Sequence, residues 1–231
     1  MPLYSPSAPT TAPYITTASN SVLSSEVIIP GMASSPDIQG SGGAGTSREF
    51  EAGDTAPTFT TAPAATDVGV TALSHLYVQT IDTTERFATY TWSASGAFDV
   101  RCKFAAALAA VTGGPDISLM VANTGRTDRV LVVCSFTLSG GLQPKAFTYT
   151  ASTFTQRGAN NMIQPVGAYV YTRMARDGSN NVSFYCSANG IAWQLIATQS
   201  FTFTVGEIGF RFNNTSSTDT RFYIDWLRTD V

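Results

Sequence analysis

The sequence predicts an all-β protein, specifically an antiparallel β-sandwich of the jelly-roll kind preceded by an extended N-terminal arm. Three observations predict this. From about residue 50 onward apolar and polar residues alternate with a period of two, which is the pattern of half-buried strands. Clusters of Gly, Asn, Asp and Ser, such as NTGRTD and RDGSNN, separate the alternating stretches and are typical of turns. The composition also changes sharply near residue 50.

Residues 1–47 form the first part of the chain. They hold six of the eleven prolines and only two charged residues, Glu26 and Asp37, and they end in the run GSGGAGTS. So few apolar residues cannot offset the conformational entropy lost on ordering the segment. We therefore expect an anchoring arm with a Gly/Ser hinge over 1–47 and one sandwich domain over 48–231.

One stretch of the arm is more apolar than the rest. It lies just before Pro30-Gly31, which would end a strand. A terminal segment this polar is rarely ordered unless a partner holds it. The expected partner-binding residues of the arm are Val22, Leu23, Val27, Ile28 and Ile29.

The strands of the sandwich follow in order. In AFDVRCKFAAAL every second residue from Asp99 to Lys103 is charged, namely Asp99, Arg101 and Lys103, and the residues between them are apolar. The charged residues are expected to face outward. AAALAAV could also suit a helix, but it directly follows this strong strand pattern. Further strands are predicted at 130–136, 167–174, 181–186, 207–212 and 221–227.

Two strand pairings can be predicted in detail. A two-residue hairpin turn at Asn189-Gly190 would place Cys186 opposite Trp193 and Phe184 opposite Leu195, all on one face. This register favours a core position for Trp193 over a ligand platform. Near the chain end, Phe222, Ile224 and Trp226 share a face, and their expected partners are Ile208, Phe210 and Phe212.

Composition excludes several classes of partner. The net charge of −3 and the 13% charged residues do not suit a nucleic-acid-binding surface. No secretory signal and no membrane span is visible. The three cysteines are odd in number and widely spaced, which indicates reduced, buried thiols in a protein made in the cytoplasm.

Catalytic and metal-binding patterns are not found in the sequence. A retaining glucanase needs two carboxylates about 5 Å apart, and no closely spaced acidic run is present. Glu207 and Asp225 are expected to be neighbours on adjacent strands, as solvated outward charges. The single histidine, His75, is expected on the surface. We therefore predict no catalytic residues, no metal, no cofactor and no enzymatic activity.

The loop from Asp177 to Asn181 gathers several side-chain oxygens. It is interpreted as a turn stabilised by Asp and Asn side chains, with a calcium site as the alternative, since calcium prefers more carboxylates than this loop offers.

Four tyrosines lie opposite in phase to the apolar residues of their strands. Such rings on the outer face of a sandwich could stack on sugar rings, or could be ordinary cross-strand pairs. The candidate glycan-binding residues are Tyr169, Tyr171, Tyr185 and Tyr223.

The run from AYVYTRMARDGSNNVSFYCSANGIAWQLIATQSF through VGEIGFRF to RFYIDWLR resembles the concanavalin A-like lectin/glucanase (laminin-G-like) sandwich. The motif match covers about residues 165–231, and the strand pattern extends it to about 77–231. This resemblance implies the fold. It does not fix the function, since the fold hosts enzymes, lectins and structural modules.

The layout of a polar arm, a Gly/Ser hinge and a lectin-like domain resembles accessory virion proteins of tailed bacteriophages. This resemblance implies a non-enzymatic structural protein of the virion, made in the host cytoplasm. Its arm would bind other virion proteins of the capsid or tail, most simply as a capsid decoration protein or head fibre. A homo-oligomer, a trimer, is expected. The alternative is a carbohydrate-binding module or a tail-fibre receptor-binding domain that recognises a host-surface glycan.

Overall fold

The fold is seen in a computed structural model of residues 1–231. The structure describes residues 46–48, 58–60, 68–70, 75–80, 84–108, 116–136, 141–162, 164–165, 167–213 and 220–230. The predicted partner-binding residues of the arm, Val22, Leu23, Val27, Ile28 and Ile29, lie outside the described residues. The arm therefore stays a prediction.

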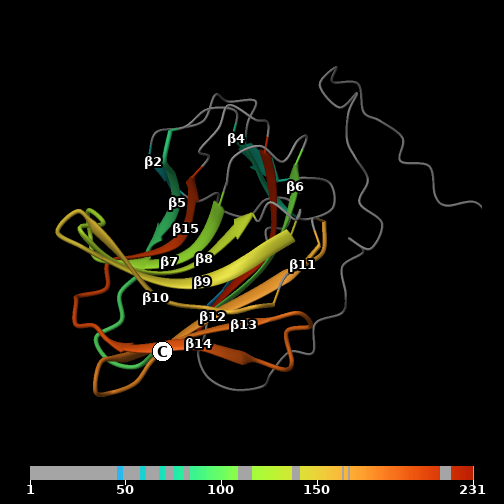
Figure 1. The fold of residues 1–231 in the computed structure, drawn as a ribbon. Coiled ribbons are helices and arrows are strands. Elements are labelled where there is room, and N and C mark those ends of the chain that lie inside the picture. The colour runs from blue at the N-terminus through green and yellow to red at the C-terminus, as the bar shows by residue number, and fades with distance from the viewer. Residues whose placement is uncertain are drawn as a thin grey trace, which may run out of the picture.

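Two eight-stranded sheets lie face to face (Figure 1). The first, sheet A, has the order β14-β13-β12-β6-β16-β4-β3, and β1 pairs with β16 beside β4. Its strands are β1 Thr46–Arg48, β3 Val68–Val70, β4 Leu76–Thr80, β6 Phe98–Leu108, β12 Val170–Arg176, β13 Asn181–Ser187, β14 Gln194–Ser200 and β16 Thr220–Asp230.

The second, sheet B, has the order β10-β9-β8-β7-β15-β5-β2, and β11 pairs with β9. Its strands are β2 Thr58–Thr60, β5 Arg86–Thr91, β7 Asp116–Ala122, β8 Asp128–Phe136, β9 Gly141–Thr150, β10 Thr153–Ala159, β11 Gln164–Pro165 and β15 Glu207–Asn213. Every pairing in both sheets is antiparallel. The predicted antiparallel β-sandwich is confirmed.

The core lies between the sheets and follows the alternation seen in the sequence. In β6, Phe98, Val100, Cys102 and Phe104 face inward and are buried. Ala105, Ala106 and Ala107 continue this strand up to Leu108. The described part of the chain contains no helix that could span a membrane.

All three cysteines are buried and free, as predicted. Burial raises the pKa of the Cys102 thiol to about 12 and that of Cys186 to about 11. Burial also raises the pKa of Cys134 well above its ordinary value. Thiols held this way behave as small hydrophobic side chains, because the reactive thiolate is suppressed.

The predicted pairing of the two aromatic strands near the chain end is wrong. Phe222 lies on β16 in sheet A, whereas Phe212 lies on β15 in sheet B. The two rings meet across the core, with centroids 5.4 Å apart. The sequence pattern identified apolar faces that do touch, but it could not distinguish a neighbouring strand from a facing sheet.

The sandwich is closed along one side, where β10 of sheet B lies next to β14 of sheet A (Figure 1). Asn160 donates a hydrogen bond to Gln194 across this side at 3.1 Å. Gly158 allows the close approach, since a Cβ there would lie only 2.6 Å from the carbonyl oxygen of Ile196. This contact shields the free edges of both terminal strands.

Where the chain enters the fold, β1 pairs with the last strand. Thr46 lies opposite Thr229, and Arg48 lies opposite Leu227. Thr46 and Ser47, which the sequence analysis assigned to the end of the hinge, thus belong to a strand of sheet A.

Candidate functional site

The outer face of sheet A carries a row of side chains that runs across five strands. Strand register places Leu195 of β14 opposite Tyr185 of β13, Tyr185 opposite Arg173 of β12, and Arg173 opposite Arg101 of β6. Arg101 in turn lies opposite Arg228 of β16. Because side chains alternate between the two faces of a strand, all five project away from the core. Three adjacent arginines on one face require nearby negative charge.

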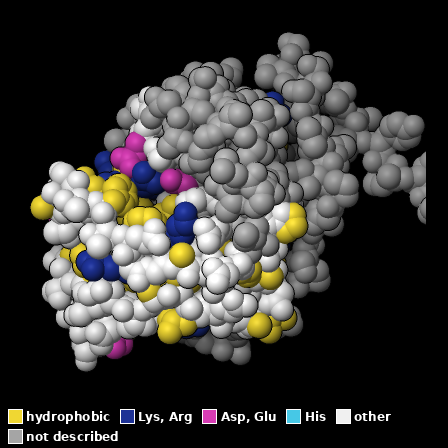
Figure 2. All heavy atoms as spheres, viewed as in Figure 1, with side chains coloured by type: hydrophobic (Ala, Val, Ile, Leu, Met, Phe, Trp, Pro, Cys, Tyr) yellow, Lys and Arg dark blue, Asp and Glu magenta, His cyan; other side chains and the backbone are white. Residues whose placement is uncertain are grey.

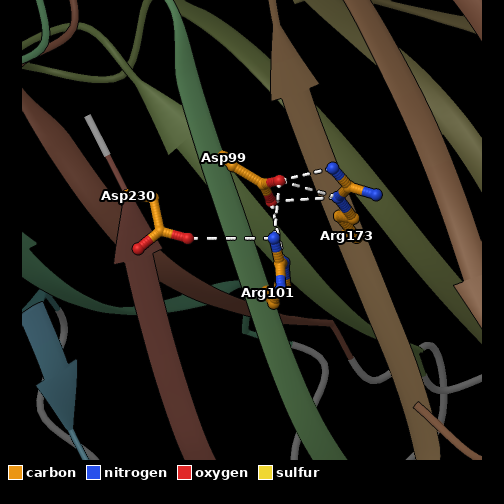
Figure 3. Close-up of polar contacts among 4 residues, drawn as sticks. All are labelled: Asp99, Arg101, Arg173 and Asp230. Atoms are coloured by element: carbon orange, nitrogen blue, oxygen red, sulfur yellow. Dashed lines mark hydrogen bonds and ion pairs between the residues drawn. The ribbon is translucent and has the colours of Figure 1, made fainter. Parts of the chain in front are cut away.

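Asp99 supplies most of that charge (Figure 3). Its carboxylate accepts hydrogen bonds from Arg101 Nε at 3.1 Å and Nη2 at 2.9 Å. It also accepts from Arg173 Nε, at 3.0 and 2.9 Å to its two oxygens. Asp230 lies 3.8 Å from Arg101 on the other side. The network fixes the planes of two guanidinium groups that would otherwise be flexible.

The same network changes the ionisation of Asp99. Burial raises the pKa of this carboxyl, but hydrogen bonds from Arg101 and Arg173 outweigh burial, so the pKa of Asp99 lies below its ordinary value.

We predict that Asp99→Asn lowers the free energy of unfolding at pH 7 and does so less at pH 3. The lowered pKa means that the Asp99 ion pairs stabilise the fold above about pH 4, the ordinary carboxyl value, and that this stabilisation is lost as the pH falls through the folded-state pKa. Asp99→Asn should reduce the free energy of unfolding by about 1 kcal/mol at pH 7. Urea titrations of both proteins at pH 7 and pH 3 check this. A difference that is unchanged at pH 3 would contradict it.

Two aromatic rings lie near Arg173. Its guanidinium carbon lies 5.1 Å from the ring centroid of Tyr185 and 6.0 Å from that of Trp193. Both rings are half-buried, so part of each reaches solvent. We call Arg173, Tyr185 and Trp193, with Asp99 and Arg101, the Arg173 cluster.

The predicted core position of Trp193 is wrong, and the reason is the turn. Strand β13 ends at Ser187 and β14 begins at Gln194, so a six-residue loop replaces the expected two-residue hairpin. Asn189 Oδ1 accepts hydrogen bonds from the backbone N–H groups of Ile191 and Ala192, both at 2.9 Å. This side-chain cap widens the loop. Cys186 then pairs with Gln194, and Trp193 is placed beside Arg173.

A second group on this face surrounds Lys103, which was expected to face solvent but has no exposed surface. Its ammonium nitrogen lies 2.5 Å from Asp225 Oδ2 and 4.2 Å from the ring centroid of Tyr169. His75, expected on the surface, is only 2% exposed, and its Nε2 lies 2.9 Å from the Tyr169 hydroxyl. The same nitrogen is 3.9 Å from Asp225. We call Lys103, Asp225, His75 and Tyr169 the Lys103 cluster.

The predicted neighbours Glu207 and Asp225 are separated by the fold. Glu207 is on β15 in sheet B, where it forms an ion pair with Arg126 at 2.6 Å. Asp225 is on β16 in sheet A and is buried against Lys103. Neither is the freely solvated charge that the sequence analysis expected.

All four candidate tyrosines are associated with the outer side of sheet A, but they differ in access. Tyr185, Tyr169 and Tyr223 are half-buried. Tyr171 is only 7% exposed, contrary to expectation. The 188–193 loop lies against it, because a Cβ on Gly190 would come within 2.8 Å of the Tyr171 ring.

Trp226 also belongs to this face, so it does not share the face of Phe222 and Ile224 as predicted. A bulge between Ile224 and Trp226 shifts the register, so that Trp226 lies opposite Lys103 and Leu227 opposite Cys102. The Trp226 ring contacts Tyr171 at 6.2 Å between centroids, and Arg228 lies 4.3 Å from it.

The turn from Asp177 to Asn181 is stabilised by Asp and Asn side chains, as predicted from the sequence. Asp177 Oδ1 accepts hydrogen bonds from the backbone N–H groups of Ser179 and Asn181, both at 2.8 Å. Its Oδ2 accepts from the Asn181 side chain at 2.9 Å. These hydrogen bonds hold the pKa of Asp177 below its ordinary value, and the bond from the Asn181 side chain makes the largest contribution.

The outer face of sheet B carries a separate charged patch. Arg211 of β15 donates to both Glu85 and Asp116, the latter at 2.6 Å. Figure 2 shows acidic and basic side chains side by side, next to hydrophobic ones, where β5 and β15 run in Figure 1. Phe154, 39% exposed, lies beneath Arg211 with 4.9 Å from the guanidinium to the ring centroid. Arg211 is thus held by acids on two sides.

Of the two outer faces, the Arg173 cluster combines features that suit a polar ligand with a flat apolar side. Two partly accessible rings offer stacking surface, and a fixed guanidinium and carboxylates offer charged hydrogen bonds. Sequence reasoning identified Tyr185 but missed Trp193, Arg173 and Asp99. The outward phase of Asp99 and Arg101 was visible in the sequence, whereas their pairing with Arg173 was not.

Two facing antiparallel sheets of this order define a concanavalin A-like, jelly-roll β-sandwich, the fold of lectins and glucanases. No family model matches the sequence, and no curated protein sequence does either. The similarities that exist are to solved structures of low sequence identity, and they establish the fold alone.

A seed lectin from Lotus tetragonolobus superposes with a TM-score of 0.62 and 11% identity, covering 80% of this chain and 96% of the lectin. A β-glucanase from Bacillus licheniformis gives a TM-score of 0.55 and 16% identity, covering 83% of this chain and all of the enzyme. A GH43 protein from the same organism superposes with a TM-score of 0.61 and 13% identity, and the match covers 80% of this chain. The chain spans only 39% of that protein's length.

These comparisons correct the prediction that the chain is not an enzyme. A β-glucanase and an O-glycanase share this fold over nearly their whole length, and a xylosidase matches it over 39% of its own length. The missing acidic run excluded one glucanase pattern, but it did not exclude the other arrangements of this fold. The fold leaves enzymatic activity open.

Proposed function

We propose that this chain binds a carbohydrate through the Arg173 cluster on the outer face of sheet A. The observation that carries the proposal is the pair of half-buried rings, Tyr185 and Trp193, near a guanidinium that Asp99 holds in place.

The chemistry of a sugar suits this arrangement. A pyranose ring has an apolar C–H face and a rim of hydroxyl groups, so it stacks on an aromatic ring while its rim makes hydrogen bonds. Arg173 and Arg101 can donate to sugar hydroxyls, and Asp230, whose side chain is 44% exposed, can accept from them. The likeness in fold to a seed lectin supports the proposal.

The rings should carry much of the affinity. Replacing Trp193 or Tyr185 with alanine removes a stacking surface worth roughly 0.5–1.5 kcal/mol beyond area burial, so each variant should bind its glycan about tenfold more weakly. The measurement is retention of the full chain on an immobilised glycan panel, followed by calorimetry with the best ligand.

Phe154→Ala is the matched control, since it removes a partly exposed ring from the outer face of sheet B. It should leave binding unchanged. Loss of binding in Phe154→Ala with retention in Trp193→Ala would move the site to sheet B and contradict the proposal. Absence of any retained glycan would also contradict it.

A second function is favoured by the abrupt composition change near residue 50. In this proposal the chain is an accessory protein of a phage virion, either a capsid decoration protein or a head fibre. Residues 1–47 anchor it to other virion proteins, and the sandwich is displayed. Val22, Leu23, Val27, Ile28 and Ile29 would add a strand to a neighbouring chain, and a trimer would multiply the contacts.

The test removes residues 1–45, which keeps Thr46–Arg48 in sheet A. Binding to particles that lack this protein should be abolished, because the anchor is gone while the sandwich is intact. Bound copies are counted after sedimentation, and circular dichroism checks the fold. The full chain carrying Val27→Asp and Ile29→Asp should fail in the same way. Attachment of either variant at the level of the unaltered chain would overturn the anchoring role.

A further inference from the structure

A pocket of about 330 Å³ lies at one end of the sandwich. It is formed where the segment after β5, the turn between β12 and β13, and the segment from β14 to β15 come together. Its lining residues are Ala94, Ser95, Arg176, Asn180, Thr202, Phe203 and Thr204. None of them belongs to the Arg173 cluster or the Lys103 cluster.

Arg176 is the only charged residue in this lining, and it is only 4% exposed. It donates to three backbone carbonyls: Gly96 at 2.8 Å from Nε, Phe203 at 3.2 Å from Nη1, and Ala94 at 3.1 Å from Nη2. A guanidinium has five N–H groups, so one N–H on each terminal nitrogen is left. Paired N–H groups of a guanidinium match the spacing of the two oxygens of a carboxylate.

The positive charge of Arg176 has no carboxylate partner among the described residues. In the described part of the chain no carboxylate lies within ion-pair distance of it. The adjacent Asp177 turns its oxygens to Ser179 and Asn181 instead. Burial lowers the pKa of Arg176, with no acidic partner to offset it. A buried cation without a counter-ion is costly, and an anion in the pocket would relieve that cost.

The other lining residues indicate which chemical groups the rest of the ligand carries. Ser95, Thr202 and Thr204 bring hydroxyl groups and Asn180 an amide, all of which can pair with hydroxyls of a ligand. Phe203 adds an apolar wall and is half-buried. The volume lies at the lower end of the range for small-ligand pockets, which suits a monosaccharide or the end of a chain.

We infer that this pocket binds a hexuronate, an acidic sugar whose carboxylate pairs with the two unused N–H groups of Arg176 and whose hydroxyls meet the polar lining. The site is separate from the Arg173 cluster and does not depend on the function proposed for it.

Saturation-transfer NMR and calorimetry on the full chain test the inference, with glucuronate, glucose, acetate and sulfate as probes. Glucuronate should bind, glucose should bind roughly tenfold more weakly or not at all, and acetate should compete. Arg176→Lys keeps the charge but loses the two-pronged geometry, and should lose glucuronate binding.

Arg176 also ties three backbone segments together, so Arg176→Lys could lower stability. The double variant Thr202→Val and Thr204→Val keeps the shape and the arginine while it removes two hydroxyls. It should weaken glucuronate but leave acetate unchanged. Failure of the unaltered chain to bind glucuronate, unchanged binding in the double variant, or equal binding of sulfate and glucuronate would each overturn the inference.

Discussion

Asp225→Ala should lower the free energy of unfolding by about 3–5 kcal/mol, the cost of leaving a buried charge without its partner. Lys103 has no exposed surface, and Asp225 is the carboxylate beside its ammonium, at 2.5 Å. Removing that carboxylate also removes the acid next to His75. Chemical denaturation followed by tryptophan fluorescence measures the change.

The control replaces both partners, Lys103→Met with Asp225→Leu. Because the desolvation cost of both charges then disappears, this double variant should be close to the unaltered protein in stability, or above it. A double variant as unstable as Asp225→Ala would show that shape around the Lys103 cluster, rather than unpaired charge, sets the cost.

Gly209→Ala should destabilise the protein by at least about 3 kcal/mol, because overpacking against a rigid backbone cannot relax. Gly209 lies in β15, the strand that joins β5 to β7 in sheet B. A Cβ there would lie 2.0 Å from the Ala88 carbonyl oxygen and 2.8 Å from Thr89 Cα. The φ of +156° adds a conformation that other residues rarely adopt. Thermal unfolding measures the loss.

Gly178→Ala is the matched control for this prediction. Gly178 lies in the exposed turn before β13, and no atom within 4 Å would meet an added Cβ. The change there should stay within about 0.5 kcal/mol. Equal loss in both variants would mean that chain flexibility, and not the contact with β5, explains the effect.

Alternation in the sequence was enough to predict the inward face of β6 and the burial of all three cysteines. These features depend only on the period-two geometry within a single strand. The same rule failed at Trp226 and at Trp193. One follows a bulge and the other ends a widened loop, and one extra residue moves each ring to the opposite face.

The clusters on the outer face of sheet A could not be predicted for a different reason. Lys103 meets Asp225, and His75 meets Tyr169 94 positions away in the chain. The order of the strands in the sheet brings these residues together, and local sequence patterns do not specify that order. Only the outward phase of Asp99 and Arg101 and the aromatic character of Tyr185 were visible beforehand.

The way the chain enters sheet A has a mechanical consequence. Strand β1 is three residues long and is held by register pairs to β16 alone, and β2 and β3 are equally short outer strands. A pull on the arm would reach Thr46 first and peel β1 from β16 one pair at a time. Because β16 is the partner of β1, the pull passes to β16 only through these three pairs, and β6 lies one strand further in. These three pairs would therefore break before the longer pairing of β16 with β6, so the chain would lengthen at β1 while the outer face of sheet A keeps its shape.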